Sequence, residues 1–302
     1  LSGDTLWWYQ IELEDGAYTY QYNVEGQKNI ADPWSKDVTW LDPSGQWESG
    51  DYNHAKTVFS VGAPEFGWTD QNFIRPEQRD VIIYEMHIGT FNKPEDGHGT
   101  FASAIEKLPE LKALGVTMVE LMPVNEFAGD ISWGYNPAYP FAVEEAYGGP
   151  DGLKAFIDAA HGMGIGVILD VVYNHLGPGD LDIWQFDGWH ENDKGGIYFY
   201  NDYRSATPWG DTRPDYGRQE VRDYLTDNAL MWLNEFKADG LRMDMVPYMR
   251  SVSGADTGDD DHVVQRARDL AELAVAVAAP AERPAVIHHH AGVVIAERDC
   301  DC

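Results

Sequence analysis

The stretch Ala238-Asp-Gly-Leu-Arg-Met-Asp-Met-Val246 decides how the fold of this chain is interpreted. It is an apolar run that contains Arg242 and Asp244, and it lies between a segment with helical spacing and a loop. Side chains alternate between the two faces of a strand, so residues 242 and 244 are expected to point the same way. A guanidinium beside a carboxylate favours the ionised carboxylate, which is the form that a nucleophile requires. The alternative is a structural ion pair at the end of a strand. The rest of the sequence is needed to choose between a catalytic and a structural pair.

Three more apolar runs precede this one, and segments with helical spacing separate them. We expect strands at 81–87, 115–124, 164–172 and 238–246, and helices at 101–114, 152–163 and 218–236. Near-continuous apolar strands that alternate with helices are typical of a parallel sheet covered on both faces. No G-x-G-x-x-G motif or P-loop follows these strands, which disfavours a nucleotide-binding fold.

Polar residues gather where these predicted strands end. They are His87, Asn125, Glu126, Asp170, Asn174, His175, Arg242 and Asp244. A β/α barrel and an open α/β sheet both place their chemistry at the carboxyl ends of the strands. The sequence therefore predicts one functional site at this edge.

The first 60 residues have a different pattern. Trp7–Leu13 and Ala17–Val24 alternate around a turn at Asp15-Gly16, which predicts β-strands. We interpret residues 1–60 as the C-terminal part of a small β-sandwich, whose aromatic side chains either pack in its core or stack on sugar rings. A connection rich in proline and glycine at 61–79 links this region to the α/β unit.

The composition restricts the partners of the protein. With 21 basic and 51 acidic residues, the net charge is −30, which argues against nucleic acid and against an anionic membrane. A neutral polysaccharide is compatible with this charge, and adaptation to high salt is a hypothesis that accounts for it. No apolar run reaches the roughly 18 residues of a membrane span. We expect a cytoplasmic protein whose natural N-terminus lies upstream of Leu1, because the chain begins directly in strand-like sequence.

Three motifs carry a resemblance to a known family. Asp170-Val-Val-Tyr-Asn-His175, Gly240-Leu-Arg-Met-Asp-Met-Val246 and Trp133-Gly-Tyr-Asn-Pro137 resemble, in order and placement, motifs of the α-amylase superfamily, glycoside hydrolase family 13. The resemblance implies a (β/α)8 TIM barrel over 80–261, with an insertion at 176–216 and an interruption after about strand 4 or 5. The leading β-segment is similar to the starch-binding-type sandwich of that family.

The resemblance also implies roles for individual residues. Asp244 would be the nucleophile that forms a covalent glycosyl-enzyme, and Arg242 would keep it ionised. His175 would donate a hydrogen bond to the sugar in the cleaved subsite, and Asp170 would orient Arg242.

Three more residues in the matching motifs are candidates for binding. Tyr135 would stack beneath the sugar, and Trp133 is a further substrate-binding candidate. Asn174 binds calcium in many members of the family, but we expect it to be structural here, because a hard cation requires several oxygen ligands and no such set is evident. No cofactor is implied.

The sequence offers one candidate for the second catalytic carboxyl group. Retaining glycosidases need two carboxyl groups about 5 Å apart, and the family's acid/base is a glutamate at the end of the fifth strand. Gly292-Val-Val-Ile-Ala-Glu297 is the candidate for that strand, with Glu297 as the acid/base or, alternatively, as an exposed carboxylate. The His-Asp motif that the family carries after its seventh strand is not in this sequence.

The tail at 262–302 differs in composition from the rest of the chain. It contains no aromatic residue and is rich in alanine. We consider a frameshift near 261, or an alanine-rich amphipathic helix. A half barrel leaves unpaired strand edges, so we expect the chain alone to be poorly stable and inactive.

The motifs favour one activity within the family. Glu120–Val124, Tyr216–Val221 and Asn228–Leu233 resemble glycogen branching enzymes, while maltooligosyl-trehalose trehalohydrolases share the segment that begins at Asp170. The preferred prediction is 1,4-α-glucan branching by double displacement on glycogen, starch or maltooligosaccharide. The alternatives are an α-glucan hydrolase of the trehalohydrolase or amylase type, and a non-catalytic glucan-binding protein.

Overall fold

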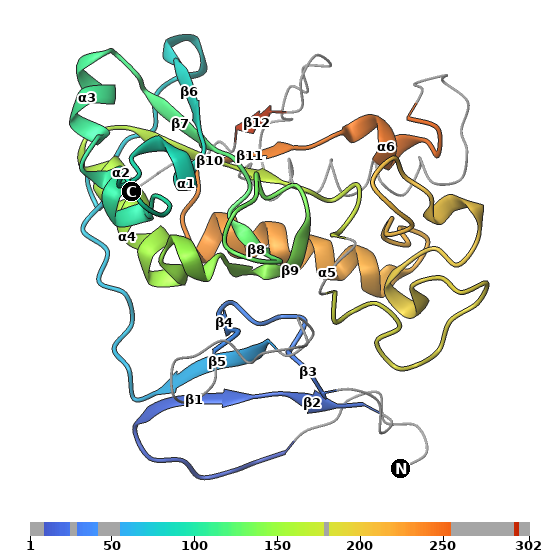
Figure 1. The fold of residues 1–302 in the computed structure, drawn as a ribbon. Coiled ribbons are helices and arrows are strands. Elements are labelled where there is room, and N and C mark those ends of the chain that lie inside the picture. Colours follow the sequence, from blue (N-terminus) through green and yellow to red (C-terminus); the bar gives the residue numbers. More distant parts are fainter. Residues whose placement is uncertain (1–8, 25–28, 42–54, 178–180, 255–292, 296–302) are drawn as a thin grey trace, which may run out of the picture.

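Four of the apolar runs form a parallel sheet in the computed structural model. The structure describes residues 9–24, 29–41, 55–177, 181–254 and 293–295. The parallel strands are β6 (Ile83–Met86), β7 (Met118–Leu121), β10 (Gly166–Val171) and β11 (Gly240–Met243), neighbours in that order (Figure 1). Leu169 pairs with both Leu121 and Leu241, so the carboxyl ends of these strands meet at one edge of the sheet. The parallel sheet expected from the sequence is confirmed for these four strands.

Helices follow the strands as the sequence pattern indicates. They are α1 (Ile88–Phe91), α2 (Phe101–Ile105), α3 (Leu108–Ala113), α4 (Gly149–Gly162), α5 (Gln219–Leu230) and α6 (Val246–Arg250). Single helical turns are η1 (Gln78–Asp80), η2 (Glu145–Tyr147), η3 (Gly196–Tyr198), η4 (Tyr203–Ser205) and the π-helical turn η5 (Met231–Glu235). Leu153 and Phe156 of α4 are buried in one core with Val119, Val167 and Leu169 of the sheet. In Figure 1, α4 and α5 lie on the same side of the sheet.

The helix expected at 101–114 is divided in two. Helix α2 begins at a capping box, in which Thr100 and Ser103 exchange side-chain-to-backbone hydrogen bonds, and it ends at Ile105. Pro109 lies in the first turn of α3. Proline has no N–H, and its ring collides with the carbonyl group four residues earlier, so one continuous helix cannot pass through it.

The N-terminal region forms two small antiparallel sheets. One has the order β1 (Gly16–Tyr20), β5 (Lys56–Val61), β4 (Val38–Thr39), and the other pairs β2 (Tyr22–Asn23) with β3 (Asn29–Ile30). The alternation in Trp7–Leu13 predicted a strand, but residues 9–13 form none, and Tyr9 and Ile11 are exposed. Alternation alone does not make a strand where no partner lies alongside to accept its backbone hydrogen bonds.

A hairpin that the sequence did not predict connects this region to the parallel sheet. Strands β8 (Asn125–Phe127) and β9 (Pro137–Val143) pair antiparallel with irregular register. Tyr139 and Ala142 of β9 are buried in one core with Val38 and Trp40. The hairpin therefore packs against the N-terminal region, and Figure 1 shows β8 and β9 between the parallel sheet and β4.

The strand expected at 292–297 differs from the prediction. Strand β12 (Val293–Ile295) pairs with β11 in the antiparallel direction, with Arg242 opposite Val293 and Gly240 opposite Ile295. A fifth barrel strand would run parallel to β11, so this part of the prediction is wrong for the described residues. The strand ends beside Gly240, at the opposite end of β11 from Asp244. Glu297 lies outside the described residues, as does the rest of the tail expected to be anomalous.

Candidate active site

One guanidinium joins two carboxylates at the carboxyl end of the sheet. Arg242 is the register neighbour of Asp170 on the adjacent strand, so their side chains project from the same face. Its Nη1 lies 2.9 and 2.8 Å from the two carboxylate oxygens of Asp170 and 2.9 Å from Oδ1 of Asp244. The expected contact between Arg242 and Asp244 is confirmed. Both carboxylates are buried, whereas the Arg242 side chain is 30% exposed.

The second oxygen of Asp244 also has a donor. Nδ2 of Asn174 donates to Oδ2 of Asp244 at 3.0 Å and to the Asp244 carbonyl at 3.0 Å. The Asp244 amide donates to the carbonyl of Val171, which continues the ladder between β10 and β11 by one more bond. Each carboxylate oxygen of Asp244 is therefore held by a different side chain.

Tyr135 contributes a third contact to Asp170. Its hydroxyl donates to Oδ2 of Asp170 at 2.8 Å, from the loop between β8 and β9. Burial raises the pKa of Asp170 to about 7, although the hydrogen bonds from Arg242 and Tyr135 act in the opposite direction. Burial and the Asp170 charge also raise the pKa of Tyr135, so its hydroxyl stays protonated and donates. Burial opposes the charge of Arg242, but its bonds to Asp170 raise its pKa above the ordinary value.

His175 lies beneath an aromatic ring. Its Nε2 is 2.8 Å from the carbonyl of Tyr135, and its Nδ1 is 2.6 Å from Oδ1 of Asn174. The indole of Trp209 stacks on the imidazole, with ring centres 4.5 Å apart and an angle of 18° between the planes. Burial lowers the pKa of His175.

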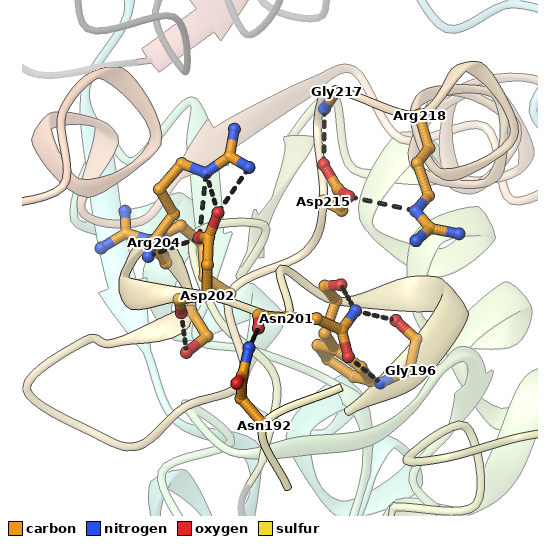
Figure 2. Close-up of polar contacts among 11 residues, drawn as sticks. Asn192, Gly196, Asn201, Asp202, Arg204, Asp215, Gly217 and Arg218 are labelled. Atoms are coloured by element: carbon orange, nitrogen blue, oxygen red, sulfur yellow. Dashed lines mark hydrogen bonds and ion pairs between the residues drawn. The ribbon is translucent and has the colours of Figure 1, made fainter. Parts of the chain in front are cut away.

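Hydrogen bonds between side chains and backbone support the insertion expected at 176–216, which carries Trp209. Figure 2 shows Asn201 at the centre of one group, where its side chain bonds both the N–H and the carbonyl of Gly196. In the same view, Asp202 receives Nε and Nη2 of Arg204, and Asp215 receives Nε of Arg218. These contacts replace regular secondary structure as the support of the segment.

Arg213 joins the insertion to the helix that follows Asp244. It is fully buried, and its guanidinium donates to the backbone carbonyls of Arg204, Ala206, Tyr248, Ser251 and Val252. Five carbonyl acceptors satisfy the planar donor fork of an arginine, which a lysine could not match. Arg213 therefore fixes α6 against the insertion.

The structure brings together most of the residues that the sequence selected. Asp170, His175, Arg242, Asp244 and Tyr135 form one connected group through the bonds given above. Trp133 lies on the same loop as Tyr135 and is 70% exposed.

Two further expectations concern Asn174 and Glu297. Both polar ends of the Asn174 side chain are engaged, with Asp244 and with His175. Among the described residues, no group of three or more acidic, histidine or cysteine side chains could hold a metal ion. Glu297 cannot be placed relative to Asp244.

Sequence reasoning missed Trp209 and Arg213. Both lie in the aromatic-rich insertion, which was recognised only as a segment. The signal available was the aromatic residue in Thr207-Pro-Trp-Gly210, a turn-forming stretch. Nothing in the local sequence tells which ring such a tryptophan contacts.

Comparisons with known proteins agree on one family. Residues 90–181 match the family described as alpha amylase, catalytic domain. The chain is 34% identical over 306 residues to the malto-oligosyltrehalose trehalohydrolase of Saccharolobus solfataricus, covering 96% of this chain and 46% of that protein. It is 36% identical over 220 residues to the 1,4-alpha-glucan branching enzyme of Pseudoalteromonas atlantica, covering 69% and 29%. A crystal structure from Salmonella typhimurium described as an alpha amylase superposes with a TM-score of 0.65 at 32% identity, covering 86% and 38%. The chain spans less than half the length of these relatives.

Proposed function

This chain belongs to the α-amylase superfamily, glycoside hydrolase family 13, and on that premise we propose that it acts on α-1,4-glucans through a covalent intermediate on Asp244. The observation that carries the proposal is the pair of bonds that fix the two oxygens of Asp244, one from Arg242 and one from Asn174. A nucleophile held in one orientation loses little further freedom on reaching the transition state.

The remaining residues are assigned roles around that nucleophile. One oxygen of Asp244 attacks the anomeric carbon, and the bond to the leaving oxygen breaks as an acid protonates it. Tyr135 and Trp133 offer aromatic surfaces to the sugar ring, and a hydrogen bond from His175 to the sugar would replace the contact of its Nε2 with the Tyr135 carbonyl. Strand β12 runs antiparallel to β11 and ends at the opposite end from Asp244, so the acid is not assigned to Glu297. The group that protonates the leaving oxygen then acts as the base that activates the acceptor in the second step.

We place hydrolysis of the trehalohydrolase type before branching. The match to the relative named malto-oligosyltrehalose trehalohydrolase extends over 96% of this chain, whereas the match to the branching enzyme covers 69%. The branching activity preferred from the sequence stays a prediction. The two reactions share the glycosyl-enzyme and differ in the acceptor, which is water in one and a 6-hydroxyl of a glucan in the other.

The test uses D244N, which keeps the size of the side chain and removes its charge. Maltooligosaccharides, malto-oligosyl trehalose and amylose are incubated with the wild type, with D244N and with the exposed control R79K, since the Arg79 side chain is 77% exposed. If the site is competent in this chain, we expect reducing sugar or free trehalose from the wild type and R79K, and a loss of about a thousandfold or more in D244N. Turnover by the wild type would overturn the expectation that the chain alone is inactive. A changed iodine colour of amylose without new reducing ends would assign branching instead. Glucan binding without turnover in the wild type would support the non-catalytic alternative.

A further inference from the structure

The loop that carries Trp133 and Tyr135 has little regular structure of its own. It connects β8 to β9 over residues 128–136, and the carbonyl of Ser132 lies near its middle. Within the loop, the Ser132 hydroxyl contacts Oδ1 of Asn136 and accepts the N–H of Gly134 at 3.0 Å. Gly134 has a φ of +85°, and a Cβ there would lie 2.4 Å from the carbonyl oxygen of Pro123. The loop thus lies directly on the backbone that follows β7.

Two histidines from different strand ends hold this loop. Nε2 of His175, after β10, lies 2.8 Å from the carbonyl of Tyr135. Nε2 of His87, at the end of β6, lies 2.7 Å from the carbonyl of Ser132. The two anchored carbonyls flank Trp133 and Gly134, so this part of the loop is held from both sides.

The surroundings of His87 fix which nitrogen carries its hydrogen. A carbonyl oxygen only accepts, so the Nε2 that faces Ser132 must carry the hydrogen. Nδ1 is then free to accept from the Thr90 hydroxyl at 3.1 Å. The Tyr147 hydroxyl lies 3.0 Å from the same Nε2 and 3.3 Å from the Ser132 carbonyl, which closes the group.

The imidazole of His87 is closely packed against Gly89. A Cβ on Gly89 would lie 2.9 Å from Cε1 of His87 and 3.1 Å from the Tyr147 hydroxyl. Only glycine at this position leaves the imidazole where it reaches Ser132. The stretch His87-Ile-Gly-Thr90 therefore places the Nε2–H of His87 where it donates to the Ser132 carbonyl of the loop.

We propose that His87 is a positioning residue, which holds the loop so that Tyr135 faces the sugar beside Asp170 and Asp244. His87 contacts neither carboxylate by any bond given above, and it acts through the Ser132 carbonyl. The inference rests on the proposed function for its sugar, but the clamp on the loop does not depend on turnover. It follows that the Nε2 donor matters, rather than the charge or bulk of the ring.

Three variants separate these contributions. H87L keeps comparable bulk without a donor, and H87Q places an amide N–H near the position of Nε2. H98L is the matched control, because His98 contacts the ring of Tyr147 from another side and bonds the Gly99 carbonyl instead of the loop. If H87L does not fold, G89A displaces the same imidazole while keeping the histidine.

The first readout is hydrogen–deuterium exchange of the peptide 128–136 in the full chain. We expect H87L to exchange about tenfold faster there, the effect of one lost hydrogen bond, while H87Q and H98L match the wild type. Exchange in β10 should be equal in all four proteins. Unchanged exchange of the loop in H87L, or H87Q as fast as H87L, would overturn the proposal.

The second readout is the Kd for maltopentaose in the D244N background, which prevents turnover. We expect H87L to weaken binding about five- to tenfold and H87Q to restore it. Equal affinity in D244N and in D244N carrying H87L, with a loosened loop, would overturn the role in positioning Tyr135. A parent protein that does not bind maltopentaose at all, with the exchange pattern as expected, would refute the proposed function and the sugar in this proposal, but would leave the clamp on the loop.

Discussion

Asp170 gives the site its own pH dependence at the scale of a single residue. Burial raises its pKa to about 7, and its ionised form is the one that accepts from Arg242 and Tyr135. As the pH falls through this value the carboxylate is protonated, and its hold on Arg242 weakens. The proposed turnover should therefore rise with pH through about 7.

The variant Y135F tests this assignment. The hydrogen bond from Tyr135 lowers the pKa of Asp170, so its removal should move the acid limb of kcat on maltooligosaccharides to higher pH. Y203F is the control, because Tyr203 is 72% exposed. An acid limb that stays in place in Y135F, or moves to lower pH, would contradict the role of Asp170.

At the scale of elements, two buried carboxyl groups lie in and beside the hairpin β8–β9, and one of them bonds the residue that follows β4. Glu126 accepts from Nε1 of Trp40 at 2.7 Å, and Glu144 accepts from the amides of Phe127 and Ala146. Burial raises the pKa of both glutamates, with Glu145 and Asp37 as further acidic neighbours of Glu126. The folded state therefore holds protons that the unfolded chain releases above its ordinary pKa of about 4.5.

The free energy of unfolding should accordingly fall as the pH rises. The stability contributed by protonated Glu126 and Glu144 is fully present below about pH 4.5 and is lost as the pH rises through their raised pKa values. Urea unfolding between pH 5 and 9 measures this slope. The variant E126Q should flatten it, while E95Q, at an exposed position, should not. A slope that is equal in both variants would contradict this account.

Helix α4 is attached to the preceding connection by a buried histidine. His161 lies between Oδ2 of Asp70 and Oδ2 of Asp239, 2.9 Å from each, and the ring of Phe73 stacks on it. Two acceptors require two N–H donors, and burial opposes the charge, yet the bonds to the aspartates raise the pKa of His161. The imidazolium thus joins the connection, α4 and the loop before β11.

The substitution H161Q should cost about 3 kcal/mol, the usual effect of breaking a buried ion pair. Because the pKa is raised in the folded state, this contribution is complete below about pH 6.5 and is lost as the pH rises through the raised value. Chemical denaturation should therefore show a larger difference between wild type and H161Q at pH 6 than at pH 9. H190Q, at an exposed histidine, serves as the control. An equal difference at both pH values would show that the pair is not charged.

At the scale of the whole molecule, the net charge of −30 governs how stability depends on salt. Like charges repel one another in the folded state, and salt screens this repulsion over a distance of about 10 Å at 0.1 M. The melting temperature should rise from low to molar sodium chloride. A melting temperature that is constant over this range would refute the hypothesis of adaptation to high salt.

The division of the chain proposed from composition also belongs to this scale. We propose a β-domain over 1–60, a connection over 61–79 and a catalytic unit over 80–261. In the described residues, the first two of these segments contact the third through side chains: Trp40 reaches Glu126, and Asp70 reaches His161.

Within the part of the chain that the structure describes, none of the helices has the length and apolar character needed to cross a membrane.

The sequence by itself determined the parallel strands and the edge at which they end. Of the residues expected there, five lie together in the structure: Asp170, Asn174, His175, Arg242 and Asp244. Asn125 and Glu126 belong instead to β8, where they bond the Pro140 carbonyl and Trp40. The resemblance to the family implied that Asp170 orients Arg242, and the parallel register of β10 and β11 makes the two residues neighbours. Pro109 is visible in the sequence and could also have predicted the division of the helix at 101–114.

Only the tertiary structure decided the direction of β12, the stack of Trp209 on His175, the burial of Arg213 and the hold of His87 on Ser132. Each of these depends on the distance between segments that are far apart in the chain, and on how much water the packing removes. Periodicity describes one segment at a time, so it contains neither quantity. For the same reason the raised pKa of Asp170 could not be read from its motif, because burial is a property of the packed molecule.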